Sequence, residues 1–226
     1  MFLHRIHLNP RHRDARRDLA DPYQLHATLS RAFSPADTPC PAGAFLWRLE
    51  PECSPTGAAR ILIQSRELPD WSRIANPGWM DQDPDPAVDL DSRLHLDSLA
   101  LGRSFRFRLR ANPSTSKDGK RIGLTTLEAQ EAWLDRKGRE QHGFELSHLE
   151  MPNFFAGTEV RPDLRITQAQ MLRGRQQSGN SIQIFSALFE GALKVTDPGT
   201  FRTALHQGIG HGKAMGLGML SVVPLP

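Results

Sequence analysis

Gly208-Ile-Gly-His-Gly-Lys-Ala-Met-Gly-Leu-Gly218 is the stretch of the chain that most constrains its fold. It follows an amphipathic segment that predicts a helix and precedes an apolar segment, residues 219–223, that predicts a strand. Glycine adopts positive φ and has no Cβ, so such a loop can bring backbone N–H groups against a ligand. Because a concave run of amides binds anions and Lys213 adds a positive charge, we predict a phosphate site here. The predicted contacts are Gly208, Gly210, Gly212, Gly216 and Gly218.

The order of elements around these glycines excludes two familiar phosphate-binding motifs. A P-loop requires Gly-Lys followed by Ser or Thr at the start of a helix, and a dinucleotide-binding fingerprint requires a strand before the glycines and a helix after them. Here the helix comes first and the strand follows. A flexible connector between helix and strand is the alternative interpretation of the glycine content.

Length and composition indicate a weakly basic protein with room for one large domain or two small ones. The chain has 226 residues and a formal net charge of +3, so the placement of its arginines matters more than their sum. Cys40 and Cys53 have neither metal-ligand nor redox spacing, from which we expect a reduced, cytoplasmic protein without metal or cofactor. No apolar run has the length of a membrane span, so we expect no membrane association.

A helix is predicted to begin at Asp21-Pro22, where a capping side chain precedes proline at the first helical position. With 3.6 residues per turn, its apolar stripe faces the core and Tyr23 and His26 lie on the neighbouring face. His26 is therefore expected at the boundary between core and surface, partly desolvated yet reachable. A core-edge histidine that bonds a carbonyl group is the alternative.

Two sets of arginines are predicted to lie on strands. Residues 103–110 alternate without interruption, so one face is apolar and the other carries a basic row, Arg106, Arg108 and Arg110. Such a row repels itself unless an anion covers it or carboxylates pair with it. A polar loop with Lys117, Lys120 and Arg121 follows. Residues 164–175 predict the first arm of a hairpin that turns at residues 178–180, and shared parity predicts a second basic row of Arg165, Arg173 and Arg175.

The remaining strand and helix signals repeat one plan twice. Strand signals at residues 2–8, 44–49 and 59–64 surround the first helix, and residues 76–91 are rich in Pro, Asp and Gly, as at a domain boundary. The second half again alternates strands with two helices. We therefore predict an α+β protein with two tandem ferredoxin-like, RRM-like βαββαβ domains, residues 1–91 and 92–226.

Several of these segments, in this order, resemble the CasE family of the RAMP superfamily over nearly the whole chain. They are Phe2-Leu-His-Arg-Ile, Asp21-Pro-Tyr-Gln-Leu-His26, Phe107-Arg-Leu-Arg-Ala-Asn-Pro113, Val195-Thr-Asp-Pro198 and the glycine loop. The resemblance implies a type I-E CRISPR endoribonuclease that binds a repeat hairpin and cleaves pre-crRNA at the 3′ side of the stem base without metal. It also implies retention of the crRNA within Cascade, beside other subunits, and we expect a monomer when the protein is free. The family's active-site pair corresponds to Tyr23 and His26.

The chemistry of these residues agrees with that implication. RNA supplies its own nucleophile, the 2′-OH, and a histidine can accept its proton near neutral pH. Tyr23 can orient the sugar, and Lys213 can hold the scissile phosphate, so His26, Tyr23 and Lys213 are the predicted catalytic residues. His211 has no assigned place, which leaves a second catalytic histidine open. The basic residues named above and the loop glycines are the predicted RNA contacts.

The sequence also allows two other functions. A metal-dependent nuclease is the weaker, because the acidic residues of positions 81–91 are spread through a Pro-rich loop without ligand spacing. A non-catalytic RNA-binding subunit of the same fold, within a CRISPR effector complex, is the stronger. It requires the basic rows and the glycine loop but not the Tyr23–His26 pair, and the presence of this pair favours the nuclease.

Overall fold

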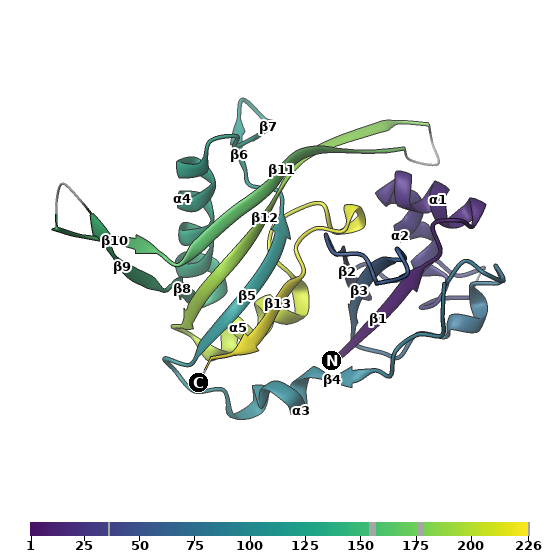
Figure 1. Ribbon diagram of the computed structural model, residues 1–226, viewed down its shortest axis with the longest axis horizontal. Coiled ribbons are helices and arrows are strands. Elements are labelled where there is room, and N and C mark those ends of the chain that lie inside the picture. Colours follow the sequence, from purple (N-terminus) through teal and green to yellow (C-terminus); the bar gives the residue numbers. More distant parts are fainter. Residues whose placement is uncertain (36, 154–156, 176–178, 226) are drawn as a thin grey trace.

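Two antiparallel sheets lie side by side in the computed structural model, with helices packed on them (Figure 1). The structure describes residues 1–35, 37–153, 157–175 and 179–225. The predicted α+β class is confirmed, and each sheet has the strand order of the ferredoxin-like plan.

The N-terminal sheet has the order β2-β3-β1-β4. Its first helical crossover consists of two consecutive helices, while the second is reduced to a single 3₁₀ turn, η1. A core of aliphatic side chains and two tryptophans fills the space between sheet and helices. The elements are β1 (Phe2–Leu8), α1 (Arg13–Ala20), α2 (Pro22–Ser30), β2 (Phe45–Leu49), β3 (Ala59–Ser65), η1 (Trp71–Arg73) and β4 (Val88–Asp89).

The C-terminal sheet has the order β11-β12-β5-β13, and β8 also pairs with β12. Helices α4 and α5 are its two crossovers, and α3 and η2 connect it to the N-terminal sheet. The elements are α3 (Leu90–Leu94), η2 (Leu96–Ser98), β5 (Ser104–Ala111), α4 (Leu127–Lys137), β8 (Phe144–Leu146), β11 (Leu164–Arg175), β12 (Ser181–Val195), α5 (Pro198–Gln207), η4 (Lys213–Met215) and β13 (Leu220–Pro224).

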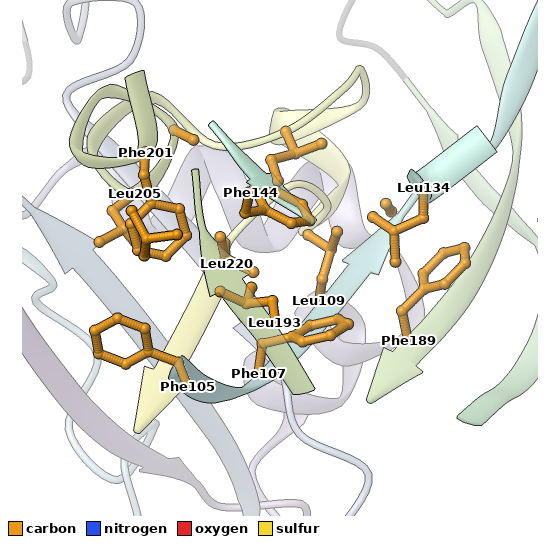
Figure 2. Close-up of a cluster of buried hydrophobic side chains, with 14 of the residues drawn as sticks. Phe105, Phe107, Leu109, Leu134, Phe144, Phe189, Leu193, Phe201, Leu205 and Leu220 are labelled. Carbon is orange, nitrogen blue, oxygen red and sulfur yellow. The ribbon is translucent and has the colours of Figure 1, made fainter. Parts of the chain in front are cut away.

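Alternation along β5 creates the core of this second half. Phe105, Phe107 and Leu109 point toward the helices and are at most 5% exposed. Figure 2 shows them packed with Phe189 of β12 and Phe201 of α5. The predicted apolar face of residues 103–110 is confirmed, and the arginines of β5 therefore point to the opposite face.

Two smaller hairpins project from the C-terminal half. One consists of β6 (Ser114–Lys117) and β7 (Lys120–Gly123), and the other of β9 (His148–Asn153) and β10 (Gly157–Pro162). The long hairpin β11–β12 extends over the N-terminal half, above α1 and α2 (Figure 1). Its turn was predicted at residues 178–180, of which Ser178 lies outside the described residues.

The second basic row is wrong as predicted, because β11 contains a β-bulge. Gln168 has a φ of 49°, and the pairing register shifts between Thr167 and Gln170. Before the bulge Arg165 lies opposite Glu190, whereas after it Arg173 lies opposite Gln183. Those two partners are an odd number of residues apart on a regular strand, so they point to opposite faces. Arg165 therefore does not share a face with Arg173 and Arg175.

Direct hydrogen bonds join the two halves of the molecule. The side chain of Gln64 on β3 donates to the carbonyl oxygen of Leu205 on α5 at 2.5 Å. Arg48 on β2 donates to the carbonyl oxygens of Arg108 and Met219, each at 3.1 Å. The domain boundary after residue 91 falls within α3 and stays a prediction.

Candidate active site and nucleic-acid interface

Helix α2 begins as predicted, and its cap also holds the long hairpin. The Asp21 carboxylate accepts from the amides of Tyr23 and Gln24 at 2.9 and 3.4 Å, and Pro22 occupies the first helical turn. The other oxygen of the Asp21 carboxylate accepts from the backbone N–H of Arg175 on β11 at 3.1 Å. The Gln24 side chain donates to the carbonyl oxygen of Arg175 at 3.4 Å. The hairpin is thus fixed to α2 through backbone atoms, which leaves the Arg175 side chain exposed.

His26 lies half-buried on α2, at the boundary between core and surface where it was predicted. Its ring stacks on Phe45, with centroids 4.9 Å apart, and Phe45 stacks in turn on Phe33 at 4.7 Å. Burial lowers the pKa of His26, so its imidazole is neutral at pH 7 and can accept a proton. The buried Nδ1 atom has no hydrogen-bond partner among the described residues, unlike the carbonyl-bonded histidine of the alternative interpretation.

The glycine loop packs beside α2 through the 3₁₀ turn η4 at its centre. Lys213 is the first residue of this turn. It lines a cavity of about 590 Å³ together with Phe33, Gly43, Arg66 and His206. Phe33, which lines this cavity, also belongs to the ring stack that ends at His26. Tyr23 lies half-buried one turn before His26.

All five predicted loop glycines have positive φ, but most of their amides are used within the protein. Gly208, Gly216 and Gly218 donate to the carbonyl oxygens of Ala204, Lys213 and Arg110 at 2.8, 3.1 and 2.7 Å. The prediction that these three amides contact phosphate is therefore wrong, because each of them already donates to a carbonyl oxygen of the protein. The contacts at Gly210 and Gly212 stay predictions.

Gly216 illustrates the packing role of these loop glycines. A Cβ atom built on it would lie 2.9 Å from the ring of Trp47, and its φ is 75°. Only glycine allows β2 and the loop to approach this closely. The glycines thus shape the loop that presents Lys213.

Carboxylates surround the basic row of β5, which is one of the two arrangements that the sequence allowed. Arg108 donates to Glu190 at 2.8 Å, to Glu52 at 3.0 Å and to the buried Glu50. Burial lowers the pKa of Arg108, but the hydrogen bonds to these carboxylates outweigh it and the pKa is raised. Arg106 pairs with Asp163 at 2.9 Å.

Arg110, the third member of the row, is only 8% exposed and donates to Gln168. Of the two arrangements that the sequence allowed, pairing with carboxylates is the one observed for Arg106 and Arg108, and RNA contact by this row stays a prediction. The row lies between the two halves of the molecule, where Arg48 also pairs with Glu50 at 2.6 Å.

The other predicted cations are open to solvent. Lys117, Lys120 and Arg121 lie exposed on the β6–β7 hairpin, and Arg173 and Arg175 lie exposed on β11. Across the described residues, none of the five has a carboxylate within ion-pair distance, so they are free to meet an anion. Arg165 is also exposed, but it borders the groove between the halves together with Arg106.

Sequence reasoning missed two basic residues that lie near Lys213. His142 ends the π-helical turn Gly138–His142, and Lys137 ends α4. Burial is the main cause of the lowered pKa of His142, and the charges of Lys137 and Lys213 lower this pKa further. No spacing in the sequence connects residue 137 with residue 213, since the fold alone brings them together.

Within the part of the chain that the structure describes, no group of three or more His, Cys, Asp or Glu side chains has the geometry of a metal site. No helix there is both long and apolar enough to cross a membrane. Cys40 and Cys53 are not joined in a disulfide.

Comparison with known proteins agrees with the fold. The profile of the family described as "CRISPR associated protein" matches residues 1–224. This chain belongs to that family. It is 39% identical over 233 residues to the CRISPR-associated endoribonuclease Cse3 of Thermus thermophilus, covering 99% of this chain and all of that protein. It is 29% identical over 220 residues to the Cascade subunit CasE of Escherichia coli, covering 91% and 93% of the two chains.

Solved structures extend the comparison to three dimensions. Thermus thermophilus Cse3, bound to an RNA representing a pre-cleavage complex, matches this CRISPR-associated protein with a TM-score of 0.79 at 37% identity. The match covers 99% of this chain and 98% of that one. The two ferredoxin-like halves and the resemblance to the CasE group of type I-E repeat-processing proteins are confirmed.

Proposed function

We propose that this protein is an endoribonuclease that binds a CRISPR repeat hairpin and cleaves pre-crRNA at the 3′ side of the stem base. It then retains the crRNA as a subunit of Cascade. Membership in the family supports this, as do the relatives, of which one is named an endoribonuclease and one a Cascade subunit. The free cysteines agree with a cytoplasmic location.

The packing of α2, which carries the neutral His26, against η4, which begins at Lys213, is the observation that supports the proposal most strongly. His26 accepts the proton of the 2′-OH, whose oxygen then attacks the adjacent phosphorus atom. The 2′-O–P bond forms as the P–O5′ bond breaks, and the 5′ oxygen leaves with a proton from an acid. Lys213 stabilises the charge that develops on the phosphoryl oxygens, and Tyr23 orients the sugar.

RNA affinity is assigned to the exposed cations. Lys117, Lys120 and Arg121 contact phosphates from one side, and Arg173 and Arg175 from the tip of the long hairpin. Each such contact releases counterions, so binding should weaken steeply as salt is raised. We assign no RNA contact to the basic row of β5, Arg106, Arg108 and Arg110. Carboxylates and Gln168 already pair with these arginines between the two halves of the molecule.

Incubation of the protein with a labelled repeat hairpin in EDTA tests the proposal. We expect one cut at the 3′ side of the stem base, leaving a 5′-hydroxyl and a 2′,3′-cyclic phosphate or 3′-phosphate. Tight binding without a cut would support the non-catalytic RNA-binding subunit instead. A cut only after Mg²⁺ is added would contradict the mechanism.

A further inference from the structure

Five basic side chains from four elements lie on or near the glycine loop. We call them the α4 basic cluster, and they are Arg121 of β7, Lys137 of α4, His142 of the π-helical turn, and His211 and Lys213 of the loop. The loop lies against α4, because a Cβ atom built on Gly210 would be 3.5 Å from the Trp133 ring.

The members of this cluster act on one another electrostatically. Burial lowers the pKa of His211, and the charges of Arg121, Lys137 and Lys213 lower it further. The pKa of Lys137 is lowered by burial, then by Arg136 and Arg121, while Glu140 opposes this. Like charges lower one another's pKa only where they lie close together with little compensation.

Carboxylates do not neutralise the cluster as they neutralise Arg108. Among the described residues, no member has a carboxylate within ion-pair distance, and the one hydrogen bond from the Lys137 side chain goes to Gln141 at 2.7 Å. The nearby Asp135 is paired with Arg139 at 3.0 Å. Asp197, beside the π-helical turn, caps α5 by accepting from Thr200. The cluster is thus a concentration of positive charge, which Glu140 opposes at Lys137.

We propose that the α4 basic cluster binds consecutive backbone phosphates of the RNA next to the scissile phosphate, with Lys137, His142 and His211 as contacts. This rests on the proposed function, since Lys213 belongs to both the cluster and the cleavage site. A polyanion fits better than an acidic protein segment, because the cluster continues into the exposed cations of the β6–β7 hairpin. Spaced phosphates match such a track of cations, whereas hydrogen-bonding groups that read bases are scarce within it.

The two histidines make this binding sensitive to pH. In the free protein their neighbours Arg121, Lys137 and Lys213 favour the neutral form, and burial does so as well. Phosphates raise the pKa of a nearby histidine because they stabilise the charged form. RNA binding therefore takes up protons, and the affinity falls as pH rises through the neutral range.

The test uses a repeat hairpin with a 2′-deoxy nucleotide at the cut site, so that binding is measured without cleavage. Lys137→Gln should weaken affinity about three- to tenfold near 0.1 M salt and reduce the slope of log K against log salt by about 0.7–0.9. Arg121→Gln should act in the same direction, and its exposed position makes unfolding no concern. Lys194→Gln is the matched control, because Lys194 lies exposed near the C-terminal end of β12. This replacement should change neither the affinity nor the salt slope.

A second arm measures affinity between pH 5.5 and 8.5. The double variant His142→Gln/His211→Gln should show a flatter pH dependence than the unmodified protein. If Lys137→Gln and Arg121→Gln keep the full salt slope, or if the double variant keeps the full pH dependence, the cluster does not bind RNA phosphates. If the unmodified protein binds no repeat hairpin at all, the proposed function itself fails.

Discussion

At the scale of single residues, His26 obtains its properties from its position on α2. The helical period places it beside the apolar stripe, and stacking on Phe45 removes part of its ring from water. Burial lowers its pKa, so the neutral form, which accepts protons, is present at and below neutral pH. This much could be predicted from the sequence, since the Asp21-Pro22 cap sets the phase of the helix.

Replacement of His26 separates chemistry from binding. His26→Ala should keep hairpin affinity within a few-fold and lower the single-turnover rate by roughly 10²-fold or more, because the histidine acts only as the bond breaks. One titration and one time course with saturating protein measure both quantities. His148→Ala, an exposed histidine on β9, is the control and should cut at the normal rate.

The pH profile gives this prediction a second readout. Because the pKa of His26 is lowered, the rate should stay high at neutral pH and fall only below the ordinary histidine value of about 6.5. His26→Ala should lose this inflection. An equal loss of affinity and rate would make His26 a binding residue, and an unchanged rate would favour His211 or His206 as the base.

At the scale of elements, the long hairpin shows where sequence reasoning ends. The strand β11 was predicted at its observed bounds, because its alternation and length are read directly from the sequence. The bulge at Gln168 was not, since a glutamine with positive φ has no local signal. One extra residue was enough to turn Arg173 to the face opposite Arg165.

The cap of α2 should hold the hairpin as well as the helix. Asp21→Ala removes acceptors for Tyr23, Gln24 and Arg175, so it should lower the free energy of unfolding by about 1–2 kcal/mol and speed amide exchange of Arg175. Asp197→Ala is the matched control: Asp197 also precedes a proline at the start of a helix, α5. Asp197→Ala should lower the free energy of unfolding by a similar amount, but it should not speed amide exchange at Arg175. Equal exchange in both variants would contradict the coupling of cap and hairpin.

At the scale of the whole molecule, charge pairs and backbone contacts join two ferredoxin-like halves. Sequence alternation placed Arg108 on the polar face of β5 but could not show that Glu50 and Glu52 of the other half face it. Likewise, it could not show that Lys137 and His142 lie near Lys213. Both arrangements depend on tertiary packing between elements far apart in the chain.

Loss of Arg108 should therefore change stability rather than RNA binding. Arg108→Gln leaves the buried Glu50 with one fewer cation, so it should lower the free energy of unfolding by about 3 kcal/mol. Urea unfolding measures this change, and Arg103→Gln, exposed just before β5, is the control. The salt slope of hairpin binding should not change. Unchanged stability with a smaller salt slope would restore Arg108 as a phosphate contact.

In the proposed mechanism, the RNA's own 2′-OH attacks the scissile phosphate at the site between α2 and the glycine loop. Single-turnover cleavage of two hairpins, one all-ribose and one with hydrogen in place of the 2′-OH at the cut site, tests it most directly. We expect both hairpins to bind with similar affinity in EDTA, and only the all-ribose hairpin to be cut, leaving a 5′-hydroxyl. Cleavage of the deoxy hairpin at the normal rate would contradict the mechanism.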